Sequence, residues 1–282
     1  MIQKHDISFL FDRSPIAKRF LSIPVINDIL SDGGFIGGGF AHALVTGRTD
    51  IRQYLREGDI DFFFETTRAV DRNLLKIQSI DDKMRSGPSV YRTGNVLESF
   101  GRWAYDIPVE IEFIGDPIYT KLQFIKFNHG DQVSTLESFD LLASRVAFNS
   151  THVWIDDRLL EMWDRKQIVI LKGHEAKFLT SRLRKYVTRH LYENGLSEES
   201  RPIFLKWMMQ KCNNPESLKQ IVSLARSCNN VILDEDLILL LGKHKLLPSP
   251  IGGPFAASIK YEDDYGDFVF QTLRTRAEAR AT

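Results

Sequence analysis

The sequence predicts an α+β protein, in which a small mixed β-sheet with flanking helices is followed by a mostly helical C-terminal region. Two observations predict the sheet. A short apolar run breaks into glycines over residues 35–40, and residues 59–64, 109–114 and 121–127 alternate apolar with polar side chains as half-buried strands do. The helical region follows from Thr180 onward, where apolar residues recur at helical spacing.

We divide the chain into three parts. Residues 1–150 form the α+β core, residues 151–246 a helical domain, and residues 247–282 a peripheral or partly disordered tail. The tail is assigned because prolines and glycines precede its acidic and basic end. The first boundary is soft, because the helix expected from Glu137 fits either neighbouring part.

Local signals place the elements of the core. In order, we expect a helix opened by Ser14-Pro15, a buried strand over residues 35–37, a glycine turn into a helix ending near Leu44, a strand over residues 59–64, and an amphipathic helix over residues 66–84. Two further strands are expected over residues 109–114 and 121–127, with a turn at Asp116-Pro117 between them. Ser134 to Glu137 has capping-box spacing, which predicts a helix running on through Ala147.

Composition limits the class of protein. The 282 residues include 37 Lys+Arg and 37 Asp+Glu, so net charge gives no reason to expect nucleic acid or an anionic membrane as partner. Two cysteines without metal-ligand spacing favour a reducing compartment. No apolar run approaches the ~20 residues that span a bilayer, and the first residues lack a signal-peptide layout. We therefore expect a cytoplasmic protein without a membrane partner.

The chemistry is concentrated in the glycine turn, Gly37-Gly38-Gly39, and in the strand that carries Asp59 and Asp61. Carboxylates at i and i+2 of a strand point to one face, where they can share one divalent cation or bridge two. Glycines at a helix start let phosphates approach backbone N–H groups. The alternative is a tight turn next to ordinary strand-end acids, and finding both motifs in this order argues against it.

These residues resemble the DNA polymerase β-like nucleotidyltransferase superfamily, on the side related to CCA-adding enzymes and poly(A) polymerases. A second resemblance, to nucleotidyltransferase-like proteins of phages, large viruses and fungi, rests on three later motifs: Leu122-Gln123-Phe124-Ile125, Phe139-Asp140-Leu141, and Arg182-Leu183-Arg184-Lys185-Tyr186 with Arg189. Together the motifs cover residues 35–190. The resemblance implies a nucleotidyltransferase core, magnesium (two ions) held by Asp59 and Asp61, and an NTP as donor.

The third carboxylate of the family has no single counterpart in the sequence. Glu110 and Glu112 share one face of a predicted strand, and we favour Glu112 as the third catalytic residue with Asp59 and Asp61; Glu98 is a weaker alternative. Both strand acids can equally be solvent-facing. The family-like strand itself carries Gln123, an amide, so the acid that would activate an acceptor hydroxyl is left open.

A basic stripe is expected on the helix after residue 180. Arg182, Lys185 and Arg189 recur at spacings of three and four, which places them on one helix face. A triphosphate or an RNA backbone suits that face, and a solvated charged face is the equal alternative. We assign these three residues, with Gly37, Gly38 and Gly39, to nucleotide binding.

The function expected from the sequence is magnesium-dependent transfer of a nucleoside monophosphate from an NTP to an acceptor hydroxyl, with release of pyrophosphate. The acceptor would be RNA, such as a tRNA end, or a protein side chain. The alternative is a catalytically weak or inactive protein of the same fold that serves as a binding or structural subunit of a phage-type assembly, with phage or host proteins as partners.

Overall fold

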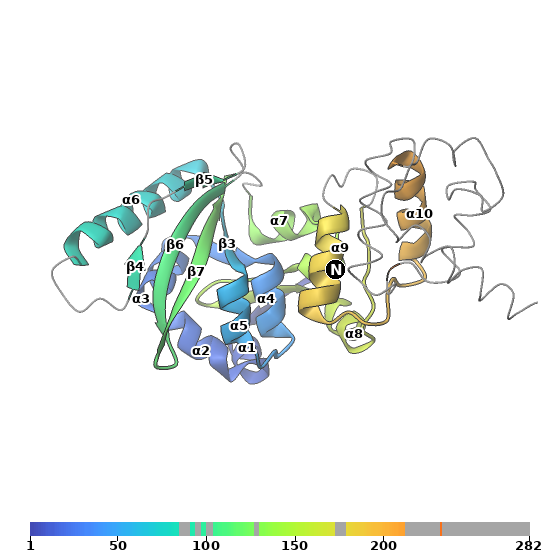
Figure 1. Ribbon diagram of the computed structural model, residues 1–282, viewed down its shortest axis with the longest axis horizontal. Helices are drawn as coiled ribbons and strands as arrows, with labels where there is room; N and C mark the ends of the chain where they lie inside the picture. The colour runs from blue at the N-terminus through green and yellow to red at the C-terminus, as the bar shows by residue number, and fades with distance from the viewer. Residues whose placement is uncertain are drawn as a thin grey trace, which may run out of the picture.

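The computed structural model describes residues 1–84, 91–93, 97–99, 104–126, 130–172, 179–211 and residue 232. In this part of the chain, one mixed β-sheet is flanked by helices, which confirms the α+β class (Figure 1). The predicted tail over residues 247–282 and the later helices of the predicted helical domain lie outside the described residues.

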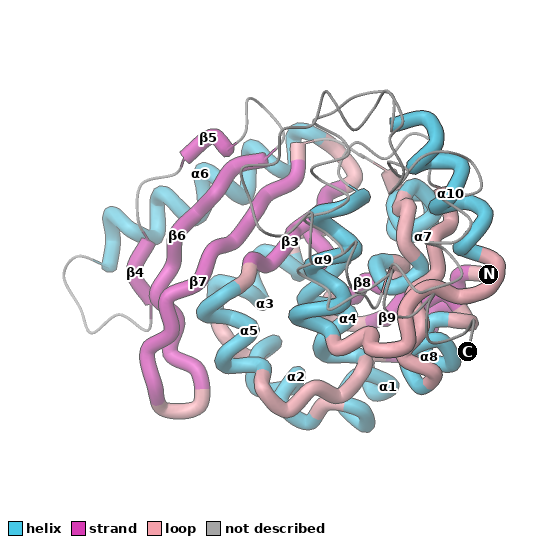
Figure 2. Tube along the Cα trace, turned by 45° about the vertical axis from the view of Figure 1, so that its right-hand side comes forward, coloured by secondary structure: helices cyan, strands magenta, loops and turns pink. Residues whose placement is uncertain are grey.

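Nine described strands form the sheet, in the order β1-β9-β8-β2-β3-β7-β6-β4, with β5 also paired to β6 (Figure 2). Only the β3–β7 pair is parallel. The strands are β1 (Ile2–Asp6), β2 (Gly34–Gly37), β3 (Asp59–Phe64), β4 (Tyr91–Thr93), β5 (Leu97–Ser99), β6 (Ala104–Phe113), β7 (Asp116–Ile125), β8 (Val146–Phe148) and β9 (His152–Asp156).

Helices cover one face of the sheet more completely than the other. The main core lies on that face and takes side chains from α1 (Ser8–Arg13), α2 (Pro15–Leu21), α3 (Pro24–Ser31), α4 (Gly38–Val45), α5 (Ile51–Glu57) and α6 (Thr67–Met84). Prolines begin both α2 and α3, where the missing N–H costs no helical hydrogen bond. A smaller apolar cluster on the opposite face includes Phe35, Phe63 and Leu136, the last from α7 (Gln132–Ser138).

A second core forms after the sheet. It gathers apolar residues of α9 (Leu179–His190) and α10 (Ser200–Lys211), together with Leu141, Ile168 and Tyr192. The short helix α8 (Leu159–Asp164) leads into this region from β9. Helix α9 lies between the sheet body and α10 (Figure 1), so its two sides face the two parts of the protein.

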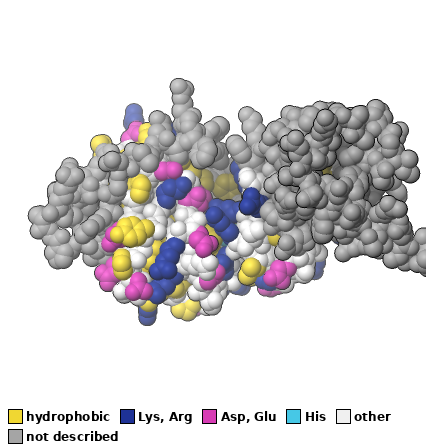
Figure 3. All heavy atoms as spheres, viewed as in Figure 1, with side chains coloured by type: hydrophobic (Ala, Val, Ile, Leu, Met, Phe, Trp, Pro, Cys, Tyr) yellow, Lys and Arg dark blue, Asp and Glu magenta, His cyan; other side chains and the backbone are white. Residues whose placement is uncertain are grey.

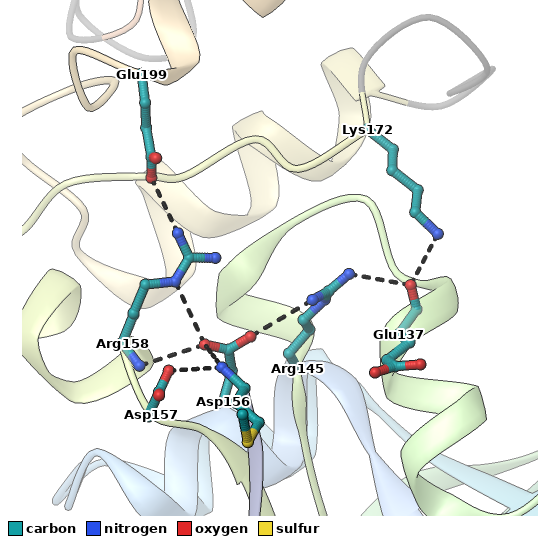
Figure 4. A network of polar contacts seen from close by, with 8 residues as sticks. Glu137, Arg145, Asp156, Asp157, Arg158, Lys172 and Glu199 are labelled. Atoms are coloured by element: carbon teal, nitrogen blue, oxygen red, sulfur yellow. Dashed lines mark hydrogen bonds and ion pairs between the residues drawn. The ribbon is translucent and has the colours of Figure 1, made fainter.

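Ion pairs connect the sheet with the region of the second core. Arg158 contacts both Asp156 at the end of β9 and Glu199 just before α10, as Figure 4 shows. Arg145 reaches Asp156 and donates to the main-chain carbonyl of Glu137, and Lys172 donates to the same carbonyl. This polar network connects the end of β9 to the loops that precede the helices of the second core.

The structure differs from the sequence prediction in three places. The helix predicted from the capping box exists, but its bounds were wrong: α7 begins after Asp131, whose side chain accepts a hydrogen bond from Ser134 N, and it ends at Ser138. The chain then enters a 3₁₀ turn (Leu142–Ser144) and β8. The turn between β6 and β7 is Ile114-Gly115, with positive φ at both residues, and Asp116 already belongs to β7.

The sheet also extends past residue 150, because β9 pairs with both β1 and β8. The hydrophobic pattern of this short strand did not separate it from the following helices. Across the residues that the structure describes, none of the helices combines the length and the apolar character needed to cross a membrane.

Candidate active site

The two predicted aspartates lie on one face of β3. Ile60, Phe62 and Phe64 point into the main core on the other face. This alternation leaves Asp59 and Asp61 half-buried together, above the smaller apolar cluster that includes Phe63. The strand is thus held by its phenylalanines, and the acids are presented on a rigid element.

The glycine turn lies beside Asp61. Strand β2 runs antiparallel to β3, with Gly37 opposite Asp61, so the start of α4 reaches the acid pair. Gly38 has φ +71, a conformation that costs a side-chain-bearing residue roughly 1–2 kcal/mol. A Cβ at Gly38 would also lie only 3.4 Å from Asp61 Oδ2. The structure therefore brings Gly37, Gly38 and the two aspartates to one place.

Helix α9 supplies the third part of the site. The Lys185 ammonium lies 3.3 Å from Asp59 Oδ1. A Cβ on Gly39 would meet Lys185 Nζ at 3.3 Å, so the lysine reaches both the acid pair and the glycine turn. In the space-filling view, Lys and Arg side chains lie next to acidic ones between the sheet body and α9 (Figure 3). We define Asp59, Asp61, Gly37–Gly39 and Lys185 as the candidate active site.

Electrostatics differ between the two acids. Burial by itself would raise the pKa of Asp59, but Lys185, with help from Lys121 and Arg189, outweighs it and holds that pKa below its usual value. Burial, and next the Asp59 charge, raise the pKa of Asp61 to about 7, although Lys185 and Arg182 oppose the shift. Arg182, Lys185 and Arg189 therefore all act electrostatically on the acid pair.

Polar contacts dock α9 beside the sheet. Arg182 pairs with Asp140, Tyr186 OH lies 2.9 Å from Ser144 Oγ, and His190 Nδ1 lies 3.0 Å from Nδ1 of His42. Arg182, Tyr186 and His190 are four residues apart, so they form one stripe, and Lys185 and Arg189 lie beside it.

The buried histidines of this stripe are neutral. Burial lowers the pKa of His42 to about 3 and that of His190 well below its usual value. Each ring therefore has one N–H donor and one acceptor nitrogen, and His42 Nε2 also lies 2.7 Å from Tyr192 OH. The histidines join α4, which begins at the glycine turn, to α9, which carries Lys185.

The structure does not bring the favoured third acid, Glu112, to this site. Gln123 of β7 is opposite Asp61, and Asp106 of β6 is opposite Gln123. Glu112 follows Asp106 by six residues on β6, which is about 20 Å along the strand, and Glu110 by four, about 13 Å. Glu112 is exposed near the β6–β7 turn, where solvent-facing acids are ordinary. The register places Glu98 opposite Tyr105, one residue from Asp106.

Asp106 is the acid that sequence reasoning missed. It lies two strands from Asp61 on the same face, about 10 Å across the sheet. Gln123 Nε2 donates to Asp106 Oδ1 at 2.8 Å, and Lys121 Nζ lies 3.4 Å from its other oxygen. The sequence does show that Asp106, Glu110 and Glu112 share one face of a strand. Which of the three lies nearest Asp61 depends on how the strands pair, and the sequence of one strand does not reveal that.

The donor set fits one divalent cation. Asp59 and Asp61 offer hard carboxylate oxygens from adjacent positions of one face, and Lys185 shows that a positive charge is accepted beside them. Among the described residues, no group of three or more His, Cys, Asp and Glu side chains could hold a metal ion. A second ion would therefore depend on ligands from a bound substrate.

Comparisons with known proteins give weak likenesses. No family model and no curated protein matches the chain. Solved structures entitled "tRNA-processing enzyme (apo form I)" and "Structure of tRNA-processing enzyme with CTP" match with TM-scores of 0.46 and 0.42 at 13% and 14% identity. The matches cover 82% and 76% of this chain, and 59% and 53% of those chains. The chain thus spans under two thirds of their length, and the likeness assigns it no activity.

Proposed function

We propose that the protein is a nucleotidyltransferase, which moves a nucleoside monophosphate from an NTP to an acceptor hydroxyl and releases pyrophosphate. The observation that carries this proposal is that Asp59 and Asp61, the glycine turn and Lys185 of α9 lie next to one another, with the Lys185 ammonium 3.3 Å from Asp59. Each of these groups is suited to one part of a magnesium-bound triphosphate.

Asp59 and Asp61 would hold the magnesium ion, which when bound neutralises phosphate charge and polarises the phosphoryl group. Helix α4 begins next to the acid pair, and Gly38 and Gly39 have no side chain to keep a phosphate from its first N–H groups. Lys185 adds positive charge beside the glycine turn, and Arg182 and Arg189 lie close enough to lower the pKa values of the acid pair. The chain's own residues thereby bind the triphosphate and fix its orientation, which is the larger part of catalysis in phosphoryl transfer.

The acceptor hydroxyl would lie on the β6–β7 side of the acid pair. There Asp106 is a proton acceptor whose carboxylate is oriented by Gln123 and Lys121. We assign it the role that the sequence alone gave to Glu112. The acceptor itself would be an RNA end, such as that of tRNA, or a protein hydroxyl.

The experiment supplies the protein with magnesium, each labelled NTP in turn, and total RNA, tRNA or a protein lysate. Label transfer that is lost in Asp59→Asn and in Asp61→Asn supports the proposal. Asp106→Asn and Glu112→Gln form a matched pair on one strand, and only the first should slow transfer, by about 10²–10⁴-fold if Asp106 is a general base. Absence of transfer with every donor and acceptor would instead favour a binding or structural subunit.

A further inference from the structure

A lysine ammonium contacts the residues that would hold the metal. Lys185 Nζ lies 3.3 Å from Asp59 Oδ1, although the two residues are 126 positions apart in the chain. Both side chains are largely buried, with 28% and 25% of their surface exposed. Shielding from water strengthens this ion pair relative to one on an open surface.

The space that the Lys185 ammonium occupies depends on the absence of a side chain at Gly39. A Cβ on Gly39 would approach Lys185 Cε to 3.2 Å and Nζ to 3.3 Å, and it would come within 2.6 Å of the Tyr54 hydroxyl. Only glycine leaves this volume open. The lysine therefore lies between the acid pair and the turn that would receive phosphates, within reach of both.

The ammonium can move while its helix stays in place. The contacts at Arg182, Tyr186 and His190, of which the last two are buried, fix one stripe of α9 on both sides of position 185. Lysine carries its charge on a flexible four-carbon stem, so rotation of the side chain alone can transfer the ammonium from a carboxylate to a nearby phosphate.

We propose that the Lys185 ammonium is the counter-ion of Asp59 until a triphosphate binds. The triphosphate then attracts the ammonium away from Asp59, so that a divalent ion binds the acid pair at full affinity only together with nucleotide. The inference rests on one part of the proposed function, that the site takes an NTP. With Lys185 on Asp59, the site already holds a positive charge and resists a second one. When the ammonium turns to phosphate oxygens, both carboxylates become available as ligands.

The first test measures Mn²⁺ binding without nucleotide, by electron paramagnetic resonance of the free ion. Lys185→Met should bind Mn²⁺ at least about 10-fold more tightly than the parent protein, as expected when a like charge a few ångströms away is removed. Arg184→Met is the matched control: it removes the same charge from an exposed position of the same helix and should change affinity by less than about 3-fold. Asp59→Asn should abolish binding. Equal or weaker Mn²⁺ binding by Lys185→Met overturns the proposal.

The second test measures binding of inorganic triphosphate in EDTA by calorimetry. The same Lys185→Met substitution should weaken this binding about 10-fold, and Arg184→Met should not. Opposite effects on the two ligands are specific to a shared cation, because a merely structural lysine would weaken both. Unchanged triphosphate binding overturns the proposal. If Lys185→Met unfolds, Lys185→Gln gives the same comparison with a polar side chain. Neither titration needs an acceptor or turnover, so both remain decisive if no transfer activity is found.

Discussion

Two clusters of charged side chains, one at the end of β9 and one at the start of β3, differ in how far their negative charges are compensated. At the rim of the sheet, the carboxylate of Asp156 is 2% exposed and contacts the guanidinium groups of Arg145 and Arg158 (Figure 4). Around Asp156 the charges balance, because Arg145, Arg158 and the N-terminal ammonium pair with Asp156, Asp157 and Glu199. At the candidate active site, two carboxylates have one ammonium in contact, that of Lys185.

The two clusters differ in how well folding alone accounts for their charges. A buried charge is costly unless opposite charges and hydrogen bonds compensate it, so folding alone favours the arrangement around Asp156. The excess negative charge at Asp59 and Asp61 opposes folding, and it becomes favourable only when a cation is added. The acid pair is thus the less fully compensated of the two, as the proposed metal site requires.

The largest effect expected from this comparison is on activity. Replacing both Asp59 and Asp61 by Asn keeps side-chain shape but removes the metal ligands, and transfer should fall by more than about 10³-fold. Because the substitution also removes mutual repulsion, the free energy of unfolding should fall by no more than about 1 kcal/mol. Transfer assays and urea denaturation check the two values. A loss of stability as large as that expected below for Asp156 would contradict the comparison.

The sequence predicted the acid pair and its turn because both are local patterns. Alternation in residues 59–64 and the glycines at 37–39 survive in the structure as β3 and the start of α4. The third acid was predicted at Glu112, whereas in the strand register Asp106 is opposite Gln123, which is itself opposite Asp61. The pairing of β6 with β7 decides that alignment, and a strand sequence with several acids on one face does not reveal it.

The same limit applies to the attachment of α9. Its basic stripe was visible in the spacing of Arg182, Lys185 and Arg189, but the partners are distant in sequence. Asp140, which the sequence showed only as part of a motif, lies past the end of α7 and pairs with Arg182. The histidines at 42 and 190 meet across 148 residues, a contact that no local pattern predicts.

The next effect concerns the compensated cluster. Asp156→Ala leaves Arg145 and Arg158 without their shared carboxylate, and the free energy of unfolding should fall by about 3–5 kcal/mol. Asp157→Ala is the matched control at the neighbouring, 39% exposed position, where about 1 kcal/mol or less is expected. Urea denaturation measures both. Transfer per folded molecule should stay unchanged in each variant, and a selective loss of activity in Asp156→Ala would place that cluster in the function.

A smaller effect follows from the pKa of Asp61, which burial and then Asp59 raise to about 7. An unfolded aspartate titrates near pH 4, so between about pH 4 and pH 7 the folded protein holds a proton that the unfolded chain has released. Stability contributed by this group is therefore lost as pH rises through that window. Relative to the parent, Asp61→Asn should gain stability as pH rises from 4 to 7, by at most about 1.4 kcal/mol per pH unit, with no further gain above pH 7.

Urea denaturation in EDTA across this pH range makes the measurement, because a bound divalent ion would compensate Asp61. Asp59→Asn tests the pair from the other side. It removes the neighbour that helps to raise the pKa of Asp61, so the pH dependence of stability should shift toward lower pH. A stability difference between Asp61→Asn and the parent that does not change with pH would show that Asp61 is already compensated, like Asp156.

The smallest effect comes from a neutral contact that belongs to neither cluster. Ser144 Oγ and Tyr186 OH lie 2.9 Å apart between the 3₁₀ turn and α9, and both residues are buried. Ser144→Ala and Tyr186→Phe should each lower the free energy of unfolding by about 1 kcal/mol, the net value of a hydrogen bond. The double variant should cost less than the sum of the two, because the second substitution removes a partner that is already unpaired.

If α9 holds Lys185 in place through this contact, the single variants should also weaken the binding of inorganic triphosphate by a few fold. Thr188→Ala, at an exposed position of the same helix, should not.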